Sequence, residues 1–203
     1  MSASGTKSLP AIGFLTVCEH SDYGLFGGFL VLNTHGRPLE FHCTAPVKPN
    51  RAQEILYGPT LRGFLYAEQI GQTLLLKAKV APLLVCTNVE PMLDVREFSS
   101  APVVLIAPEK NAEKNGEKNS EKSGDRSDKS DRASDRGWTD RAGSSNVPLL
   151  KFNLGGHSAA VRATHEDDRD ELLKLWPKLA TVVDLTEPFT RIREAIEEAR
   201  KVA

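Results

Sequence analysis

The sequence predicts an α+β fold in which an antiparallel β-meander is covered by a long helix, with further strands and two C-terminal helices. Three observations lead to this fold class. Short apolar runs alternate with turn residues over positions 11–44, apolar residues recur at helical spacing over 61–79, and a Gly-Gly turn at 155–156 joins two more strand-like runs. Extended and helical segments are therefore both expected, in separate parts of the chain.

The composition is that of an ordinary globular protein. The chain has 203 residues, with 26 Lys and Arg against 27 Asp and Glu, and 40% of its residues are hydrophobic. Its longest apolar stretches, 82–86 and 102–108, are far shorter than the ~20 residues of a membrane-spanning helix, so no membrane insertion is expected. Positions 1–10 lack the apolar centre of a secretory signal and are expected to be a flexible N-terminus. A cytoplasmic location is therefore expected.

A meander of three strands is predicted at 11–18, 28–33 and 39–44. The middle strand is apolar at both its odd-numbered and its even-numbered positions, so both of its faces are apolar, which is typical of a strand in the centre of a sheet. In the third strand, Leu39, Phe41 and Cys43 alternate with polar residues. These three side chains are therefore predicted to be buried, with the polar residues between them on an exposed face.

Two helices are predicted to follow the meander. Asn50 is expected to cap a short helix over 51–57. A longer helix is predicted over 61–79, where one face carries Phe64, Ala67, Gly71, Leu74 and Ala78. This helix is expected to cover the meander, with Gly71 allowing a close approach to the sheet.

The rest of the chain predicts five short strands and two amphipathic helices. The strands are expected at 83–86, 103–106, 149–154, 159–164 and 181–185. A segment around Pro91 and Asp94 has room for one helical turn. The first helix is expected to run through Trp176, and the last to begin at 186–188 with an apolar stripe of Phe189, Ile192, Ile196 and Ala199.

The stretch over 109–145 has a different composition from the rest of the chain. Positions 109–141 form a decaying tetrapeptide repeat with nine acidic and nine basic residues, and Trp138 is its one large apolar side chain. Ordering it would cost backbone entropy with no buried surface to offset that cost. We therefore expect a disordered polyampholyte insertion between two parts of one domain, 11–108 and 146–203. The alternative is a linker to a separate small domain over 146–203.

The first candidates for a metal-binding or catalytic site are Cys18, His20 and His42, because thiolate and imidazole are common ligands of zinc and iron. A Cys18 nucleophile with His20 as its base, oriented by Asp22, is a related possibility. Against both, no C-x-x-C pair is present, and strand alternation directs His42 and Cys43 to opposite faces. No metal, no other cofactor and no catalytic residue is therefore predicted, and a small enzyme or metal-binding protein using these three residues is kept as the alternative.

The segment over 46–66 predicts an interaction surface instead. It combines aromatic and Arg side chains with a helix bracketed by prolines, and interfaces are enriched in such side chains. The candidate interaction residues are Arg51, Glu54, Tyr57 and Tyr66. Nucleic-acid binding is not expected, because outside the charged stretch acids slightly outnumber bases. The sequence thus predicts a non-catalytic cytoplasmic interaction or scaffold module, whose partner is another protein or a second copy of the chain.

Overall fold

The computed structural model describes residues 10–107, 147–179 and 184–202, without the side chain at 202. These residues form one mixed sheet in the strand order β3-β2-β1-β4-β5-β7-β6. The strands are β1 Ala11–His20, β2 Gly24–Asn33, β3 Pro38–Cys43, β4 Leu84–Thr87, β5 Val103–Ile106, β6 Leu149–Leu154 and β7 His157–Arg162. Strands β1, β4 and β5 are parallel neighbours, and the other pairs are antiparallel. The predicted α+β fold is confirmed.

Three predicted features lie wholly or partly outside the described residues. These are the flexible N-terminus at 1–10, the charged insertion at 109–145 and the strand at 181–185. In the last case Asp184 and Leu185 are described, and neither is in a strand.

The central position predicted for β2 is confirmed by the burial of both its faces. Phe29 and Val31 belong to the core on one side of the sheet, and Leu30 and Leu32 to the core on the other. β2 pairs with β1 from Ala11↔Asn33 to His20↔Gly24, so the two strands form one long ribbon. This ribbon separates two hydrophobic cores, one on each face.

The prediction for β3 is wrong about which face is buried. Leu39 and Phe41 are 44% and 38% exposed, and Cys43 is exposed, whereas Glu40 is half-buried. The Glu40 carboxylate accepts hydrogen bonds from the backbone N–H groups of Lys79 and Val80 at 2.9 Å each. The Lys79 N–H and the His42 side chain together hold the pKa of Glu40 below its ordinary value. Glu40 thus anchors the segment around Lys79 and Val80, and this segment covers the polar face of β3.

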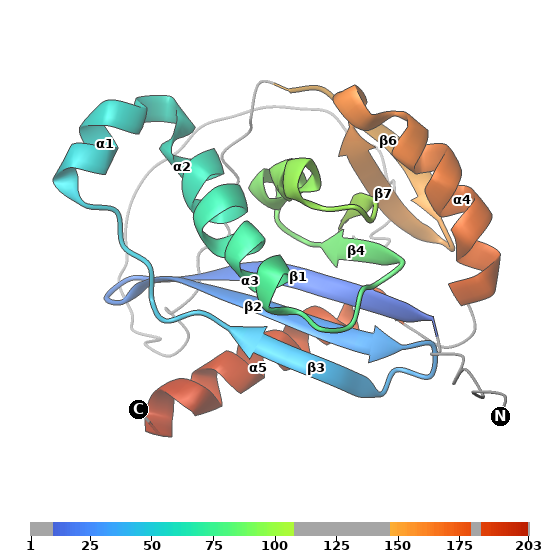
Figure 1. Ribbon diagram of the computed structural model, residues 1–203, viewed down its shortest axis with the longest axis horizontal. Helices are drawn as coiled ribbons and strands as arrows, with labels where there is room; N and C mark the ends of the chain where they lie inside the picture. Colours follow the sequence, from blue (N-terminus) through green and yellow to red (C-terminus); the bar gives the residue numbers. More distant parts are fainter. Residues whose placement is uncertain (1–9, 108–146, 180–183, 203) are drawn as a thin grey trace, which may run out of the picture.

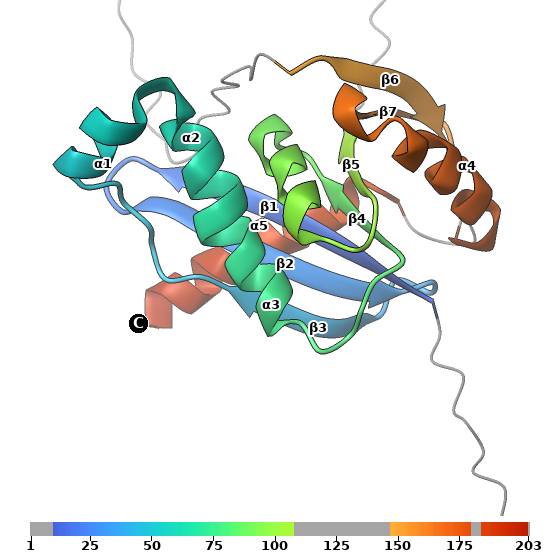
Figure 2. The same cartoon turned by 45° about the horizontal axis from the view of Figure 1, so that its top comes forward.

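One face of the sheet is covered by a helical run and by a 3₁₀ helix (Figures 1 and 2). The elements are α1 Arg51–Tyr57, η1 Gly58–Thr60, α2 Leu61–Gly63, the π-helical η2 Phe64–Gln72, α3 Thr73–Lys77 and η3 Glu90–Phe98. The predicted cap of α1 is confirmed, since the N–H of Gln53 donates to Asn50 Oδ1 at 2.8 Å. The single turn predicted near Pro91 is in fact the nine-residue η3.

The close approach to the sheet occurs at a different glycine from the one predicted. A Cβ at Gly71 would lie 2.7 Å from Val95 Cγ2, so Gly71 faces η3. A Cβ at Gly27 would lie 2.2 Å from Ile70 Cγ2, so Gly27 is where β2 admits the helical run. On the opposite face of β2, a Cβ at Gly28 would lie 2.2 Å from Ile192 Cγ2. Adjacent glycines therefore admit a helix to each face.

The other face carries α4 Asp167–Leu179 and α5 Glu187–Val202. Of the stripe predicted for the last helix, Phe189, Ile192 and Ile196 are buried, and Ala199 is exposed. Figure 2 shows α5 on the side of the sheet opposite to the helical run, while α4 lies along β6 and β7. Pro177 lies within the last turn of α4, which continues to Leu179. The described residues contain no helix that is long and apolar enough to cross a membrane.

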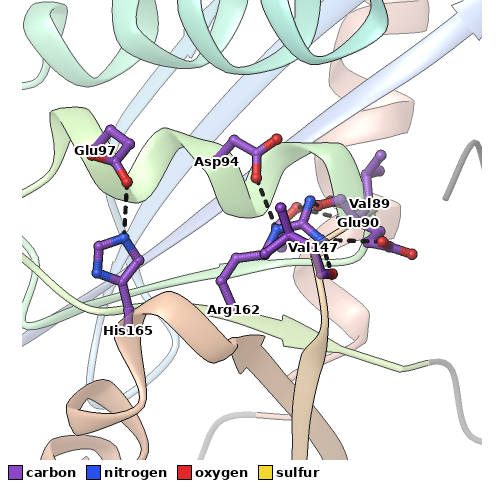
Figure 3. A network of polar contacts seen from close by, with 8 residues as sticks. Val89, Glu90, Asp94, Glu97, Val147, Arg162 and His165 are labelled. Atoms are coloured by element: carbon purple, nitrogen blue, oxygen red, sulfur yellow. Dashed lines mark hydrogen bonds and ion pairs between the residues drawn. The ribbon is translucent and has the colours of Figure 1, made fainter. Parts of the chain in front are cut away.

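A polar network ties η3 to the strands and helix that follow position 146 (Figure 3). Arg162, whose side chain is 3% exposed, donates from Nε to Asp94 at 2.8 Å and pairs with Glu90 at 3.2 Å. Arg96 binds both carboxylate oxygens of Asp168, at 2.7 and 3.0 Å, and these bonds raise the pKa of Arg96. Since β7 also pairs with β5, both parts of the chain contribute to one sheet.

Candidate functional site

The structure brings only part of the predicted interaction set to the surface. Arg51 and Glu54 are exposed on α1 and form an ion pair of 3.0 Å. Tyr57 is half-buried and stacks on Phe64, with ring centroids 4.2 Å apart. Tyr66 is 2% exposed. Arg51, Glu54 and Tyr57 therefore lie at the surface of α1, whereas Tyr66 lies in the interior.

Tyr66 belongs to a polar cluster with Glu19 and Arg62. The Tyr66 hydroxyl donates to Glu19 Oε1, and Arg62 Nη2 donates to the same oxygen at 2.9 Å. The Arg62 guanidinium also lies 5.1 Å from the centre of the Tyr66 ring, within reach of a cation–π contact. Burial, and then the bond to Glu19, raise the pKa of the Tyr66 hydroxyl well above its ordinary value. The hydroxyl therefore stays protonated and acts as a donor.

This cluster forms one wall of a pocket of about 460 Å³. The pocket lies where β1 ends, on the face covered by the helical run, and besides His20 at the end of β1 its other walls are mainly apolar side chains. They include Leu25, Val47, Pro49, Pro59, Leu61 and Leu65. Both donors of the cluster bind Glu19 Oε1, and no bond to Oε2 is seen among the described residues, so Glu19 keeps a further acceptor atom on a residue that lines the pocket. The arrangement is suited to hold an apolar group that carries a hydrogen-bond donor.

Helix α1 has its apolar side facing solvent. No residue of α1 is buried, and Ile55 and Leu56 are 67% and 81% exposed. With Ala52 they follow the spacing i, i+3, i+4, which normally marks the buried side of a helix. We call these three residues the α1 stripe. Helix α1 ends at Tyr57, and Pro59 in the 3₁₀ turn that follows lines the 460 Å³ pocket, so the pocket begins just after the stripe in the chain.

A second pocket, of about 280 Å³, lies on the side of α2 that faces η3. Three aromatic residues line it, Tyr57, Phe64 and Phe98, together with the acidic residues Glu68, Asp94 and Glu97. Asp94 is paired with Arg162 and Glu97 with His165. Glu68 is exposed, and among the described residues it has no ion-pair partner. The pocket is thus aromatic and carries negative charge at its edge.

The residues of the alternative metal or catalytic site do not converge. Cys18 and His20 lie on the face of β1 that packs against α5, where His20 Nε2 lies 2.5 Å from Arg200 Nη1. His42 is opposite Phe29 on the other face and pairs with Glu40 at 3.0 Å. Within the described part of the chain, no three His, Cys, Asp or Glu side chains gather as a metal site would require. His42 and Cys43 point to opposite faces, as strand alternation predicts.

Sequence reasoning missed Glu19 and Arg62, the two charged members of the cluster. They are 43 positions apart in the chain, and Tyr66 is 47 positions from Glu19. A polar residue near the end of a strand gives no indication of its partner. The only indication in the sequence was that Arg62 and Tyr66 are four positions apart on a helix, and so lie on the same side.

Comparison with known proteins gives no matching family model and no matching curated protein. The geometry of the described residues is therefore the basis for a functional proposal.

Replacing Tyr66 with Phe tests the energetic role of the cluster. We expect the free energy of unfolding to fall by about 1–2 kcal/mol, because a bond from a buried hydroxyl to a half-buried carboxylate is lost while Arg62 still compensates its charge. Urea denaturation measures the change. Tyr57→Phe is the matched control, because the Tyr57 ring stacks on Phe64 and its hydroxyl makes no hydrogen bond that is seen among the described residues. Equal effects of the two variants would contradict this role for Tyr66.

Proposed function

We propose that this protein is a non-catalytic interaction module that binds a partner polypeptide through the α1 stripe and the two pockets beside it. The observation that carries the proposal is the orientation of α1. In the other helices of the fold, burial of the apolar side stabilises the helix. The apolar side of α1 faces water, so α1 lacks this stabilisation. A partner that covers the stripe supplies it instead. The cytoplasmic location expected from the sequence is part of this proposal.

The size of the surface favours a polypeptide over a small molecule. A small ligand would occupy the 460 Å³ pocket and leave Ile55 and Leu56 in water. A chain that crosses the stripe covers both side chains, and burying each one contributes about 1.5–3 kcal/mol. An apolar centre surrounded by polar groups is the usual arrangement of a protein interface.

The charges beside the stripe favour a partner that is basic as well as apolar. Glu68, Asp94 and Glu97 surround the aromatic pocket of 280 Å³, and aromatic faces attract cations. At the other pocket, the Glu19 carboxylate, which Arg62 and Tyr66 bind through Oε1, has Oε2 to accept a donor from the partner. We therefore propose a partner segment in which apolar residues are accompanied by Lys or Arg, so that the cation reaches the aromatic pocket while an apolar side chain covers Leu56.

Selection from a displayed library of random peptides tests the proposal and requires no candidate partner. We expect the enriched peptides to combine Lys or Arg with large apolar residues. The dissociation constant of a synthetic copy of one such peptide, measured by fluorescence anisotropy, should rise at least about tenfold in Leu56→Glu, because a charge replaces a side chain that the bound peptide covers.

Leu76→Glu is the matched control for this experiment. Leu76 is 79% exposed, almost as much as Leu56, and it lies on α3 outside both pockets. Peptide binding should be unchanged in that variant. Enrichment of acidic peptides, or equal weakening by Leu56→Glu and Leu76→Glu, would contradict the proposal.

A further inference from the structure

We propose that β3 is a self-complementary edge through which two copies of this chain form a dimer with one continuous sheet. Strand β3 stands at one end of the sheet order, and among the described residues no strand pairs with its outer side (Figure 1). The surface is distinct from the α1 stripe, so this inference does not depend on the proposed function.

The backbone of β3 shows which of its groups a further strand can reach. The N–H of Thr44 donates to the carbonyl of Gly27 at 2.9 Å, so the backbone groups of residue 44 point toward β2. Because successive residues of a strand alternate, the N–H and C=O groups of Cys43 and Phe41 point away from β2. These are the groups that a further antiparallel strand would bond.

The side chains on the same residues are apolar and exposed. Phe41 lies opposite Leu30, and Cys43 lies opposite Gly28, on the face where α5 packs. The side chains of Phe41 and Cys43 therefore lie in a row on that face with no covering element among the described residues, and the exposed Leu39 follows at the point where the β2–β3 register shifts. An edge with free backbone groups and an apolar row is what strand addition requires.

A second copy fits this edge better than an unrelated strand, because the sequence of β3 is complementary to itself. A two-fold axis through Phe41 places the two Phe41 residues opposite each other as a hydrogen-bonded pair. The same axis places the irregular segment around Leu39 near Cys43 of the second copy, where the exposed side chains of both are apolar. On the other face it places Glu40 opposite His42 of the second copy, so the Glu40 carboxylates, which are bound within their own chains by His42 and by the Lys79 and Val80 N–H groups, meet no like charge across the axis.

The opposite edge of the sheet does not offer the same match. β6 carries Lys151 and Asn153 at exposed positions, where β3 carries apolar side chains. Pairing of β3 with β6 of another copy would also leave one free edge at each end and continue without closing. The self-pairing of β3 closes at two copies.

Sedimentation equilibrium of the full chain tests this inference over a hundredfold range of protein concentration. The wild type should pass from the monomer mass of 22.2 kDa to twice that mass and no further. Phe41→Lys should raise the dissociation constant at least about tenfold, because it places two like charges on the axis. Leu76→Lys introduces the same charge at an exposed site on α3 and should leave the dissociation constant unchanged.

A disulfide trap tests the register and does not depend on how Phe41→Lys folds. Hydrogen-bonded antiparallel pairs place their Cα atoms about 5.5 Å apart, within the range that a disulfide spans. Phe41→Cys in a Cys43→Ser background should therefore give a reducible covalent dimer when oxidised glutathione accepts the two electrons, because the axis places residue 41 opposite itself. Leu76→Cys in the same background is the control and should give no covalent dimer, because Leu76 lies on α3, away from the axis. The other native cysteines, Cys18 and Cys86, are buried.

Three results would overturn the inference. They are a single species of monomer mass at every concentration, growth beyond two copies, and a dimer whose dissociation constant is unchanged in Phe41→Lys and which the cysteine at position 41 does not cross-link. Leu56→Glu should weaken peptide binding and leave the dimer unchanged, so that variant tests the proposed function and not the dimer.

Discussion

Replacing Arg162 with Met is expected to lower the free energy of unfolding by about 3 kcal/mol or more, because it removes one partner of a buried ion pair and leaves the others without compensation. Arg162 donates to Asp94 and Glu90 and also to the backbone carbonyls of Val147 and Glu90. Methionine fills much of the same volume, so the loss reports mainly on these polar contacts. Asp94 is 37% exposed, so water compensates part of its charge, and for that reason the lower end of the range for buried pairs is expected.

Urea denaturation of the full chain measures this change, and Arg51→Met provides the control. Arg51 also forms an ion pair, but its side chain is 82% exposed, so its replacement should change the free energy of unfolding by at most about 0.5 kcal/mol. A separate measurement is proteolysis under native conditions, in which Arg162→Met should expose β6 and β7 to cleavage before β1 and β2. Similar stability of Arg162→Met and Arg51→Met would show that the network in Figure 3 does not hold the two parts together.

The elements of the fold were predictable because their signals are local. Apolar spacing gave the strands around β2 and the helical run, and a single side chain, Asn50, gave the start of α1. The burial of β3 was not predictable in the same way. Alternation shows that Leu39 and Phe41 share a face, but the side on which the sheet is covered depends on where the loop after α3 returns. At an edge strand that information is absent from the strand itself.

The candidate site was predictable only as a region. The prolines and aromatic residues of 46–66 indicated an unusual surface, and α1 does present its apolar side to solvent. The contacts that build the site join residues far apart in the chain, such as Glu19 with Tyr66 and Arg162 with Asp94. Each such pair is set by the register of strands and the position of helices, so single-sequence patterns carry no trace of it.

Gly28→Val is expected to have the second large effect on stability, through the packing of α5 on the sheet. A Cβ at position 28 would lie 2.2 Å from Ile192 Cγ2 and 3.1 Å from Ile196 Cδ1. Both isoleucines are buried in the core on that face, so neither has room to move away. The helix must therefore shift outward, which opens contacts around Phe14 and Phe189, whose rings meet edge to face at 5.7 Å. Overpacking of this kind costs about 1–3 kcal/mol or more.

Gly63→Ala is the control that separates this steric effect from the general effect of adding a methyl group to glycine. Gly63 is helical, and the nearest heavy atom outside its own helix backbone and chain neighbours to its added Cβ would be Asp94 Oδ2 at 3.7 Å, which is ordinary contact. Alanine there should stabilise the protein by about 0.5–1 kcal/mol, because glycine loses more conformational entropy in a helix. Thermal unfolding followed by circular dichroism gives both values. If Gly28→Val melts at the wild-type temperature, α5 does not depend on its close approach to β2, and the paired glycines of that strand need another explanation.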